Sequence, residues 1–324
     1  MLQQKNGLHF HGLCIDPHKS PKEEKVLFTH AHADHIKLNK NPDFFATLPT
    51  IDLIEKRFPR KYETNFTTLA YNKKYQLNDF QIELKENGHI LGSAQTKISH
   101  EEKDYIITSD FRLQDSLLFK GAKPEKCDTL VLETTFGSSQ YTFPSYDSVL
   151  NEMISFLEKN SDKLILLSGY SLGKAQELTA IANQAGLEPV VHDSIFEMNK
   201  IYEKHGVSLG KYKKLDHNLK EHSVLIMPPQ LVDKFLFATL KHFDKRDLVT
   251  ALATGWGHKR GFDVTFPLSN HADYNDLIAF VEQSQAKLVL TDHGFCEEFS
   301  RKLNRLGYNS KPLAQHKQQA IFEY

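Results

Sequence analysis

The sequence is poor in cysteine, and the three that it has, Cys14, Cys127 and Cys296, lie far apart with no CxxC pair. An odd, scattered set argues against a disulfide framework or a cysteine-based zinc site and favours a reducing compartment. The sequence also has no run of eighteen apolar residues, so we expect no membrane span. The N-terminal segment MLQQKNGLHF lacks the apolar stretch of a secretory signal peptide. Together these absences predict a cytoplasmic protein.

Neither sign of charge is in excess. The chain has 40 Lys and Arg against 41 Asp and Glu, a formal net charge of −1. The overall field therefore does not indicate nucleic-acid binding, although a single cleft can still concentrate positive charge. The 324 residues admit two domains or one large one, and 40% hydrophobic residues are typical of a soluble globular protein. Histidine is abundant, with 17 residues.

Short apolar runs alternate with amphipathic segments along the chain. The runs end at Ser, Asp, Gly or His and predict buried strands. The amphipathic segments repeat apolar residues at helical spacing, as Val149, Met153 and Leu157 do. This alternation predicts an α/β or mixed α+β architecture. The predicted strands cover 24–30, 105–108, 129–132, 163–167, 223–227 and 287–291, and the predicted helices cover 146–158, 173–184, 275–281 and 297–306.

The distribution of histidine and aspartate predicts an inserted domain. Residues 1–140 are rich in predicted strands and hold most of the clustered His and Asp residues. Residues 141–255 alternate helix and strand and hold none of that cluster, which resumes within 256–324. We therefore expect a metal-binding domain that is interrupted by a second domain.

The segment THAHADH places four candidate metal ligands, His30, His32, Asp34 and His35, within six residues. Imidazole nitrogen and carboxylate oxygen suit zinc and similar divalent ions. The alanine spacers allow the side chains to converge, and they would be unusual on a solvated, histidine-rich surface loop. Because the segment follows an apolar strand, it predicts a metal site at a strand end.

Four ligands from one loop do not surround two ions, so further ligands must come from distant loops. His89, Asp110 and His293 each follow a predicted strand, where the active sites of layered folds gather. Each alone is also compatible with a surface or capping role, but together with THAHADH they form a coherent set. The other histidines have polar surroundings and are predicted to lie on the surface: His100, His205, His217, His222 and His242.

The order HAHADH, GHILGSAQ and SDFR resembles the metallo-β-lactamase superfamily. Further segments narrow the resemblance to the β-CASP nucleases: LETTFG with Glu133 is similar to their motif A, NHAD with His271 to motif B, and TDHG with His293 to motif C. SLGKAQEL is similar to a segment of the inserted β-CASP domain. The resemblance implies an α+β fold, an αββα metallo-β-lactamase sandwich at 1–140 and 256–324, interrupted by an inserted α/β β-CASP domain at 141–255.

The resemblance also implies a dinuclear site with two Zn²⁺ ions, for which Mn²⁺ is an alternative. The implied ligands are His30, His32 and His89 on one ion and Asp34, His35 and His293 on the other, with Asp110 bridging them. Two positions depart from the family pattern: Ser109 stands where glycine is usual, and Asn270 where a small or acidic residue is commoner. Neither departure removes a ligand.

Phosphodiester hydrolysis also requires a proton for the leaving oxygen. His271, oriented by the Glu133 carboxylate, is the candidate general acid, and Asp34 completes the predicted catalytic set. From the residues alone, Glu133 could instead cap the turn that follows its strand. His271 could equally belong to the start of a helix that Asp273 caps.

Three residues are predicted to bind the substrate: Ser171, Lys174 and Arg260. Ser171 and Lys174 lie between a predicted strand and a predicted helix, where backbone N–H groups can hold an anion. A plain strand-to-helix turn is an equal alternative. Arg260 belongs to the basic segment GWGHKRG, which could contact a nucleic-acid backbone or form a solvated turn.

The predicted function is a metal-dependent nuclease. Within the family the motifs look most like those of DNA-ligase-associated exonucleases, with archaeal RNA 3′-end processing factors second. This favours a DNA exonuclease in repair, with a DNA ligase or helicase as functional partner, and RNA processing as the alternative. A thioesterase or lactonase of the same fold is a second class, which the insertion, Glu133 and His271 disfavour. A non-catalytic scaffold is a third, which the seven candidate ligands disfavour.

Overall fold

The computed structural model describes residues 2–4, 6–19, 25–40, 43–58, 65–216, 222–257 and 261–313. These residues form two compact units. The first unit runs to Asp115, resumes at Phe119–Thr142 and resumes again from His271. The second unit comprises Ser116–Leu118 and Phe143–Asn270.

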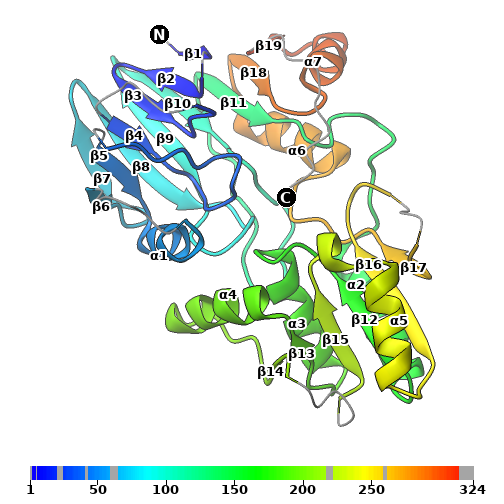
Figure 1. The fold of residues 1–324 in the computed structure, drawn as a ribbon. Coiled ribbons are helices and arrows are strands. Elements are labelled where there is room, and N and C mark those ends of the chain that lie inside the picture. Colours follow the sequence, from blue (N-terminus) through cyan, green and yellow to red (C-terminus); the bar gives the residue numbers. More distant parts are fainter. Residues whose placement is uncertain are drawn as a thin grey trace. The chain divides into compact units, whose positions relative to one another are not determined.

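The first unit contains two sheets (Figure 1). The first sheet has the order β1-β2-β3-β4-β5-β6 and is parallel from β3 to β6. The second has the order β19-β18-β11-β10-β9-β8-β7, with β10, β11, β18 and β19 parallel and the remaining pairs antiparallel. The strands of the first sheet are β1 (Gln3–Gln4), β2 (Leu8–Phe10), β3 (Leu13–Ile15), β4 (Lys25–Leu27), β5 (Asp43–Ala46) and β6 (Phe66–Thr68). Those of the second are β7 (Lys74–Leu77), β8 (Phe80–Glu86), β9 (Ala94–His100), β10 (Lys103–Ile107), β11 (Thr129–Glu133), β18 (Leu288–Asp292) and β19 (Ser310–Pro312).

The central strands of the second sheet are buried on both faces, which explains their continuous apolar runs. In β11, Val131 packs into the cluster shared by both sheets, together with Ile15 and Leu27 of the first sheet. Its neighbours Leu130 and Leu132 point the other way, into a cluster with two helices. The sandwich core therefore lies between the sheets, and a second apolar layer covers the outer face of the second sheet.

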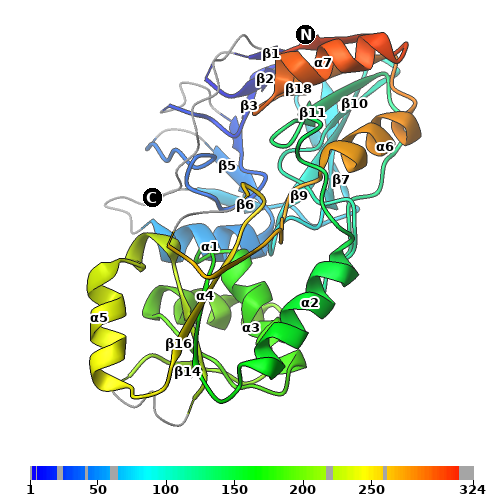
Figure 2. The ribbon, with the colours of Figure 1, turned by 90° about the vertical axis from the view of Figure 1, so that its right-hand side faces the viewer.

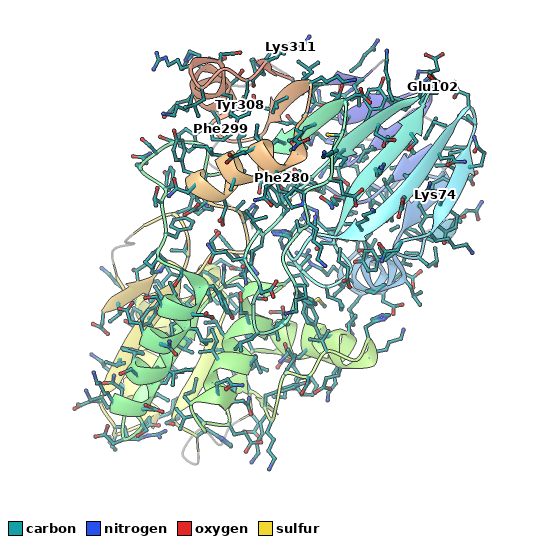
Figure 3. All side chains as sticks on the ribbon, turned by 180° about the vertical axis from the view of Figure 1, so that it is seen from behind. Lys74, Glu102, Phe280, Phe299, Tyr308 and Lys311 are labelled. Carbon is teal, nitrogen blue, oxygen red and sulfur yellow. The ribbon has the colours of Figure 1, made fainter. Side chains whose placement is uncertain are left out.

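That outer layer is formed by α6 (Tyr274–Ser284) and α7 (Cys296–Arg305), which lie beside β11 and β18 (Figure 2). Their largest buried side chains, Phe280 and Phe299, are fully inaccessible to solvent (Figure 3). The carboxylate of Asp273 begins α6 as its N-cap and accepts a hydrogen bond from the amide of Asp276 at 2.8 Å. A further helix of this unit, α1 (Leu48–Arg57), begins at the N-cap Thr47 and contacts β6.

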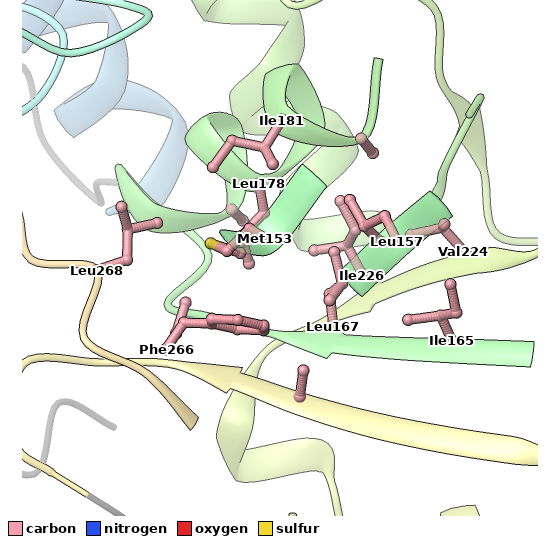
Figure 4. Close-up of a cluster of buried hydrophobic side chains, with 14 of the residues drawn as sticks. Met153, Leu157, Ile165, Leu167, Leu178, Ile181, Val224, Ile226, Phe266 and Leu268 are labelled. Carbon is pink, nitrogen blue, oxygen red and sulfur yellow. The ribbon is translucent and has the colours of Figure 1, made fainter. Parts of the chain in front are cut away.

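The second unit is built on an all-parallel sheet of order β14-β13-β15-β12-β16-β17. Its core packs strand residues such as Leu167 and Ile226 against Met153 and Leu178 from the helices (Figure 4). The strands are β12 (Leu164–Ser168), β13 (Val190–Val191), β14 (Lys213–Lys214), β15 (Val224–Met227), β16 (Leu248–Ala253) and β17 (Val264–Phe266). The helices are α2 (Tyr146–Lys159), α3 (Lys174–Gln184), α4 (Asp193–Lys204), α5 (Lys234–Phe243) and the 3₁₀ turn η1 (Pro229–Leu231).

The chain leaves the first unit and returns to it at adjacent points. The amide of Tyr274 donates to the carbonyl of Tyr141 at 3.1 Å, and both residues belong to the first unit. The units divide after Thr142 and after Asn270, whereas the sequence-based division places the second boundary after 255. The difference arises because β17 pairs with β16 and so completes the sheet of the second unit.

The predicted fold class is confirmed. Two sheets with helices and an all-parallel sheet in a separate unit agree with a metallo-β-lactamase sandwich that carries a β-CASP insertion. The predicted strands and helices named above all correspond to observed elements, with ends shifted by a few residues. Within the described ranges, no helix combines the length and the apolar character that crossing a bilayer requires.

Candidate metal centre

The predicted ligands lie on loops at one end of the strands of the first unit. The THAHADH loop follows β4, His89 follows β8, Asp110 follows β10, and His293 follows β18. β8 runs in the same direction as β10, because each is antiparallel to β9. The carboxyl ends of these strands therefore open on one edge, where ligands bind in layered folds.

Three histidines and one aspartate form the centre of this site. His30, His32, His89 and Asp110 are all buried, and one ligand atom of each lies within 4.8 Å of every other. Asp110 Oδ2 lies 3.5 Å from His30 Nε2, 3.5 Å from His35 Nε2 and 3.8 Å from His89 Nε2. Two ligand atoms of one tetrahedral zinc, each about 2.0 Å from the ion, would lie about 3.3 Å apart. These separations are long for hydrogen bonds and close to those of ligands that share an ion.

Two buried atoms support the fit to a cation. His30 Nε2 and Asp34 Oδ1 have no hydrogen-bond partner, although burying such an atom unpaired costs about 1–3 kcal/mol. His35 Nε2 also lies 3.6 Å from Asp34 Oδ2, and the nitrogens His89 Nε2 and His32 Nδ1 are within hydrogen-bond distance at 3.1 Å. Divalent ions would satisfy these nitrogen and oxygen atoms.

Asp16, which sequence reasoning missed, sets the orientation of two candidate ligands. Its Oδ2 lies 3.0 Å from His35 Nδ1 and accepts a 2.5 Å hydrogen bond from Thr29 Oγ1. Thr29 Oγ1 in turn lies 3.1 Å from His30 Nδ1. Because a carboxylate only accepts, and because the Thr29 hydroxyl gives its single proton to that carboxylate, both rings carry their proton on Nδ1, which directs the Nε2 lone pairs into the site. The one sequence signal that could have identified Asp16 is its place directly after the apolar strand LCI.

Ser109 explains one departure from the family pattern. Its φ of 49° is in the left-handed region that favours glycine. Its hydroxyl lies 2.6 Å from Thr29 Oγ1 and donates to Asp16 Oδ2 at 3.3 Å. The serine therefore accepts an unfavourable backbone conformation and gains contacts with the residues that orient the ligands.

Two neighbours hold the loop that carries His89. The side-chain amide of buried Asn87 donates to the carbonyls of Thr108 at 3.1 Å and Asp110 at 2.8 Å, which ties this loop to the Asp110 loop. Gly92 has a φ of +80°, and a Cβ there would lie 2.6 Å from the amide nitrogen of Thr50 at the start of α1. Only glycine allows this close approach. Asn87 was not predicted, because a single asparagine before a glycine also marks an ordinary turn.

The side chains of the metal-free cluster differ in their protonation states. Burial and the neighbouring histidines His35 and His32 hold the pKa of His30 well below its usual range, so its ring is neutral. Burial also disfavours the charged form of His35, but nearby carboxylates, led by Asp34, raise its pKa well above the usual value. Burial raises the pKa of Asp34, but His35 and His32 outweigh this effect and lower it to about 2. The metal-free site therefore holds a proton on His35 that a cation would replace.

Glu133 and His271 form a close pair beside this cluster. His271 Nδ1 lies 3.1 Å from Glu133 Oε1, and the His271 ring lies 4.6 Å from that of His89. Glu133 is buried, and its Oε2 accepts a 2.8 Å hydrogen bond from the amide of Thr135. Burial raises the pKa of Glu133, but His271 and Thr135 outweigh it, so the net shift is downward. Burial raises the pKa of Asp110.

His293 lies beside His35, with ring centroids 5.6 Å apart and nearly parallel planes. On its other side it meets His18 edge-on at 5.8 Å. His18 was not predicted, although it follows Asp16 in the segment IDPH. A small cavity in the first unit is lined in part by His18, His35, Glu133 and His293. His293 is thus adjacent to the cluster, and its role as a ligand stays a prediction.

The predicted substrate contacts belong to the second unit. Lys174 is buried and donates to the carbonyl of Leu268 at 2.6 Å, which gives it a structural contact within this unit. Ser171 Oγ lies 3.3 Å from Ser194 Oγ. The amide of Gly173, at the start of α3, donates to the Gln176 side chain at 2.6 Å. Arg260 lies outside the described residues.

Two histidines that were predicted on the surface are largely covered. His222 is buried, and its Nδ1 lies 3.1 Å from the carbonyl of Glu188. The His100 side chain is only 8% exposed. Polar neighbours in the sequence were a poor guide, because the burial of both side chains depends on residues distant along the chain. His217 lies outside the described residues.

No protein-family model matches the chain. A probable DNA ligase from Opitutus terrae is 32% identical over 322 residues, which cover 95% of this chain and 30% of the relative. The DNA cross-link repair 1A protein of Mus musculus is 26% identical over 303 residues, which cover 82% of this chain and 28% of the relative. An RNase J-like protein from Methanocaldococcus jannaschii is 27% identical over 201 residues, which cover 53% of this chain and 47% of the relative. These matches and the buried His and Asp cluster support the assignment of the chain to the β-CASP family of the metallo-β-lactamase superfamily.

The chain spans less than half the length of each of these relatives. A crystal structure of an Enterococcus faecalis protein of unknown function matches it with a TM-score of 0.64, covering 90% of this chain and 79% of the other at 13% identity. That likeness concerns the fold alone. The family resemblance read from the motifs is confirmed, and the buried His and Asp cluster is typical of a dinuclear metal site of this family.

Proposed function

We propose that this chain is a zinc-dependent nuclease that hydrolyses phosphodiester bonds, and specifically an exonuclease that acts on DNA ends during repair. The observation that carries the proposal is the Glu133–His271 pair, 3.1 Å apart and next to the His and Asp cluster. A metal cluster alone would suit many hydrolases. An oriented imidazole beside it adds the proton donor that a poor leaving group requires.

The metal ligands we propose are those that the family pattern implies. His30, His32 and His89 would hold one Zn²⁺, Asp34, His35 and His293 the other, and Asp110 would be shared. Asp110 Oδ2 lies 3.5–3.8 Å from one ring nitrogen each of His30, His35 and His89, which supports its shared position. When bound, two such ions neutralise an anionic phosphate and acidify water toward a pKa of about 7. Mn²⁺ is the alternative occupant, because it accepts the same donor types.

The protein's own contribution is the delivery of a proton. The Glu133 carboxylate is ionised and fixed by the Thr135 amide, so it holds His271 by Nδ1 and favours the protonated ring. Nε2 of His271 is then the nitrogen that passes a proton to the leaving oxygen. Burial of Glu133 strengthens this effect, because its charge is poorly screened by water.

DNA is the substrate class that we favour, because the relative named a probable DNA ligase matches 95% of this chain. A match of that extent suggests a DNA ligase as functional partner, with a helicase as another. RNA is the second candidate, supported by the RNase J-like relative, which matches 53% of the chain. Ser171, Lys174 and Arg260 remain proposed contacts to the nucleic-acid backbone. A small-molecule hydrolase is disfavoured, because such a substrate needs no second unit of this size.

Digestion of end-labelled single- and double-stranded DNA and RNA by the zinc-loaded protein tests this proposal. We expect progressive shortening of DNA, and faster cleavage of RNA would favour the second candidate. His271→Ala should lower turnover by roughly 10²–10⁴-fold and leave the bound zinc unchanged. His242→Ala, which removes an exposed histidine of the second unit, is the matched control. Equal turnover of His271→Ala and the wild type would exclude the general-acid role.

A further inference from the structure

A second group of metal-binding side chains lies on three turns of the first unit. His11 is in the turn between β2 and β3, Asp79 in the turn between β7 and β8, and His100 at the end of β9. Asp79 Oδ2 lies 2.9 Å from His11 Nδ1 and 3.0 Å from His100 Nε2. One ligand atom of each of the three residues lies within 4.8 Å of the other two.

The turns hold these side chains in place before any ion binds. His11 has a φ of 44°, and its carbonyl accepts a 3.2 Å hydrogen bond from the side-chain amide of Asn78, the residue before Asp79. The rings of His11 and His100 lie 4.2 Å apart. Both pack on Phe10, with centroids at 4.7 and 5.7 Å. The two imidazoles therefore lose little side-chain entropy on binding a ligand.

This cluster lies at the opposite strand ends from the first site. β3 connects His11 to Asp16, and β8 connects Asp79 to the loop that carries His89. β9, with seven residues, leads from that loop to His100. A strand of that length extends over about 20 Å, so an ion here would be separate from those of the first site. His11 belongs to the first sheet and the other two residues to the second, so a shared ion would link the two sheets.

We propose that His11, Asp79 and His100 bind one divalent transition-metal ion of the zinc class, with water completing its coordination. Two imidazole nitrogens and a carboxylate oxygen suit Zn²⁺, and the required ligand separation of about 3.3 Å is a few tenths of an ångström wider than the present contacts. The Asp79 side chain is 57% exposed, which leaves the ion access to water.

The charges around the cluster are mixed. Glu101 and Glu102 are exposed in the turn that follows His100, and Figure 3 shows Glu102 at this end of the sheet. They favour a cation. Lys25, bonded to Asn78 at 3.2 Å, and Lys103, paired with His100 across the strands, oppose it. The acidic and basic groups offset each other, so the ligands themselves decide the affinity.

The test is equilibrium dialysis of the metal-free full chain against low-micromolar free Zn²⁺, followed by elemental analysis. Wild type should bind one zinc per chain more than Asp79→Asn and His11→Asn. Asp79 is exposed and His11 is in a turn, so both variants should fold. The controls are Asp115→Asn, whose side chain is similarly exposed at 58%, and His242→Asn, and both should match the wild type.

A second measurement separates this site from the first. Zinc should raise the thermal unfolding midpoint of Asp79→Asn by less than that of the wild type, and nuclease turnover should be the same in both. Equal zinc content in the wild type and the two cluster variants would overturn the proposal. Loss of zinc together with loss of turnover would also overturn it, because the cluster would then act through the first site.

Discussion

Replacing Asp16 with asparagine is the sharpest test of how the metal centre is organised. Asp16 Oδ2 faces His35 Nδ1, Thr29 Oγ1 and Ser109 Oγ at 3.0, 2.5 and 3.3 Å. Its Oδ1 accepts from the amide of Thr29 at 2.8 Å. Asparagine can keep the Oδ1 contact, but it would present an NH₂ donor in place of Oδ2. The hydroxyls can turn and accept, whereas the proton on His35 Nδ1 then has no acceptor.

The expected loss of zinc affinity follows from the one lost contact at His35 Nδ1. Without an acceptor at Nδ1, the neutral ring of His35 favours the other tautomer, in which Nε2 carries the proton and cannot bind a metal. Loss of such an outer contact usually lowers metal affinity about 10–100-fold, or roughly 1.4–2.7 kcal/mol. We expect a decrease in that range for Asp16→Asn, with nuclease turnover falling at limiting zinc and recovering at high zinc.

The assay is competition for Zn²⁺ between the protein and a chromophoric chelator at neutral pH. Asp193→Asn is the control, because the Asp193 side chain is 60% exposed and pairs with Lys214 at 3.2 Å on the surface. Circular dichroism of both metal-free variants checks that they are folded. If zinc affinity in Asp16→Asn stays within about twofold of the wild type, the argument that Asp16 sets the tautomer of His35 is incorrect.

Three further predictions concern the first unit. Asp110→Ala should lose both metal and activity, and elemental analysis that still finds two zinc ions per chain would contradict its shared position. Phe280→Ala should lower the free energy of unfolding by about 3–5 kcal/mol in urea titrations, whereas Phe235→Ala, at a side chain that is 79% exposed, should change it by less than about 0.5 kcal/mol. Because the pKa of Asp34 is lowered from 3.8 to about 2, its charge stabilises the metal-free fold above pH 3.8, and this contribution is lost as the pH falls toward 2. Urea titrations between pH 5 and 2 should show a shallower loss for Asp34→Asn, and identical slopes would refute the contacts assigned to Asp34.

The parts of the fold with a long or repeated pattern were predictable from the sequence. The spacing of Val149, Met153 and Leu157 predicts α2, and the THAHADH loop predicts a metal site without reference to any other segment. Strands β2 and β3 have three residues each, which is too short for a period to be read. Helix α5 was missed because its segment KFLFATLKHF is apolar on several sides, and Phe235 and Phe243 remain exposed.

The candidate metal ligands could be predicted from the sequence. The residues that orient or hold these ligands were much harder to predict. His89 and Asp110 follow apolar strands and carry metal-binding groups, so they could be proposed. Asp16 and Asn87 act only through partners that are distant in the sequence. A single aspartate or asparagine at a strand end is common, and only the folded chain brings each to its partner. The same holds for His100, whose polar sequence neighbours concealed its packing on Phe10.

The hydrogen bond between Tyr274 and Tyr141 has a consequence for how such a protein can evolve. This hydrogen bond holds together the two points at which the chain leaves and re-enters the first unit. For the first unit, the intervening segment is therefore equivalent to a tight surface turn. Sequence changes, exchanges or enlargements there can accumulate with little penalty to the sandwich, since lengthening a loop costs only about 0.6 kcal/mol per doubling. Selection can therefore change the second unit while the loops that carry the proposed metal ligands stay constant.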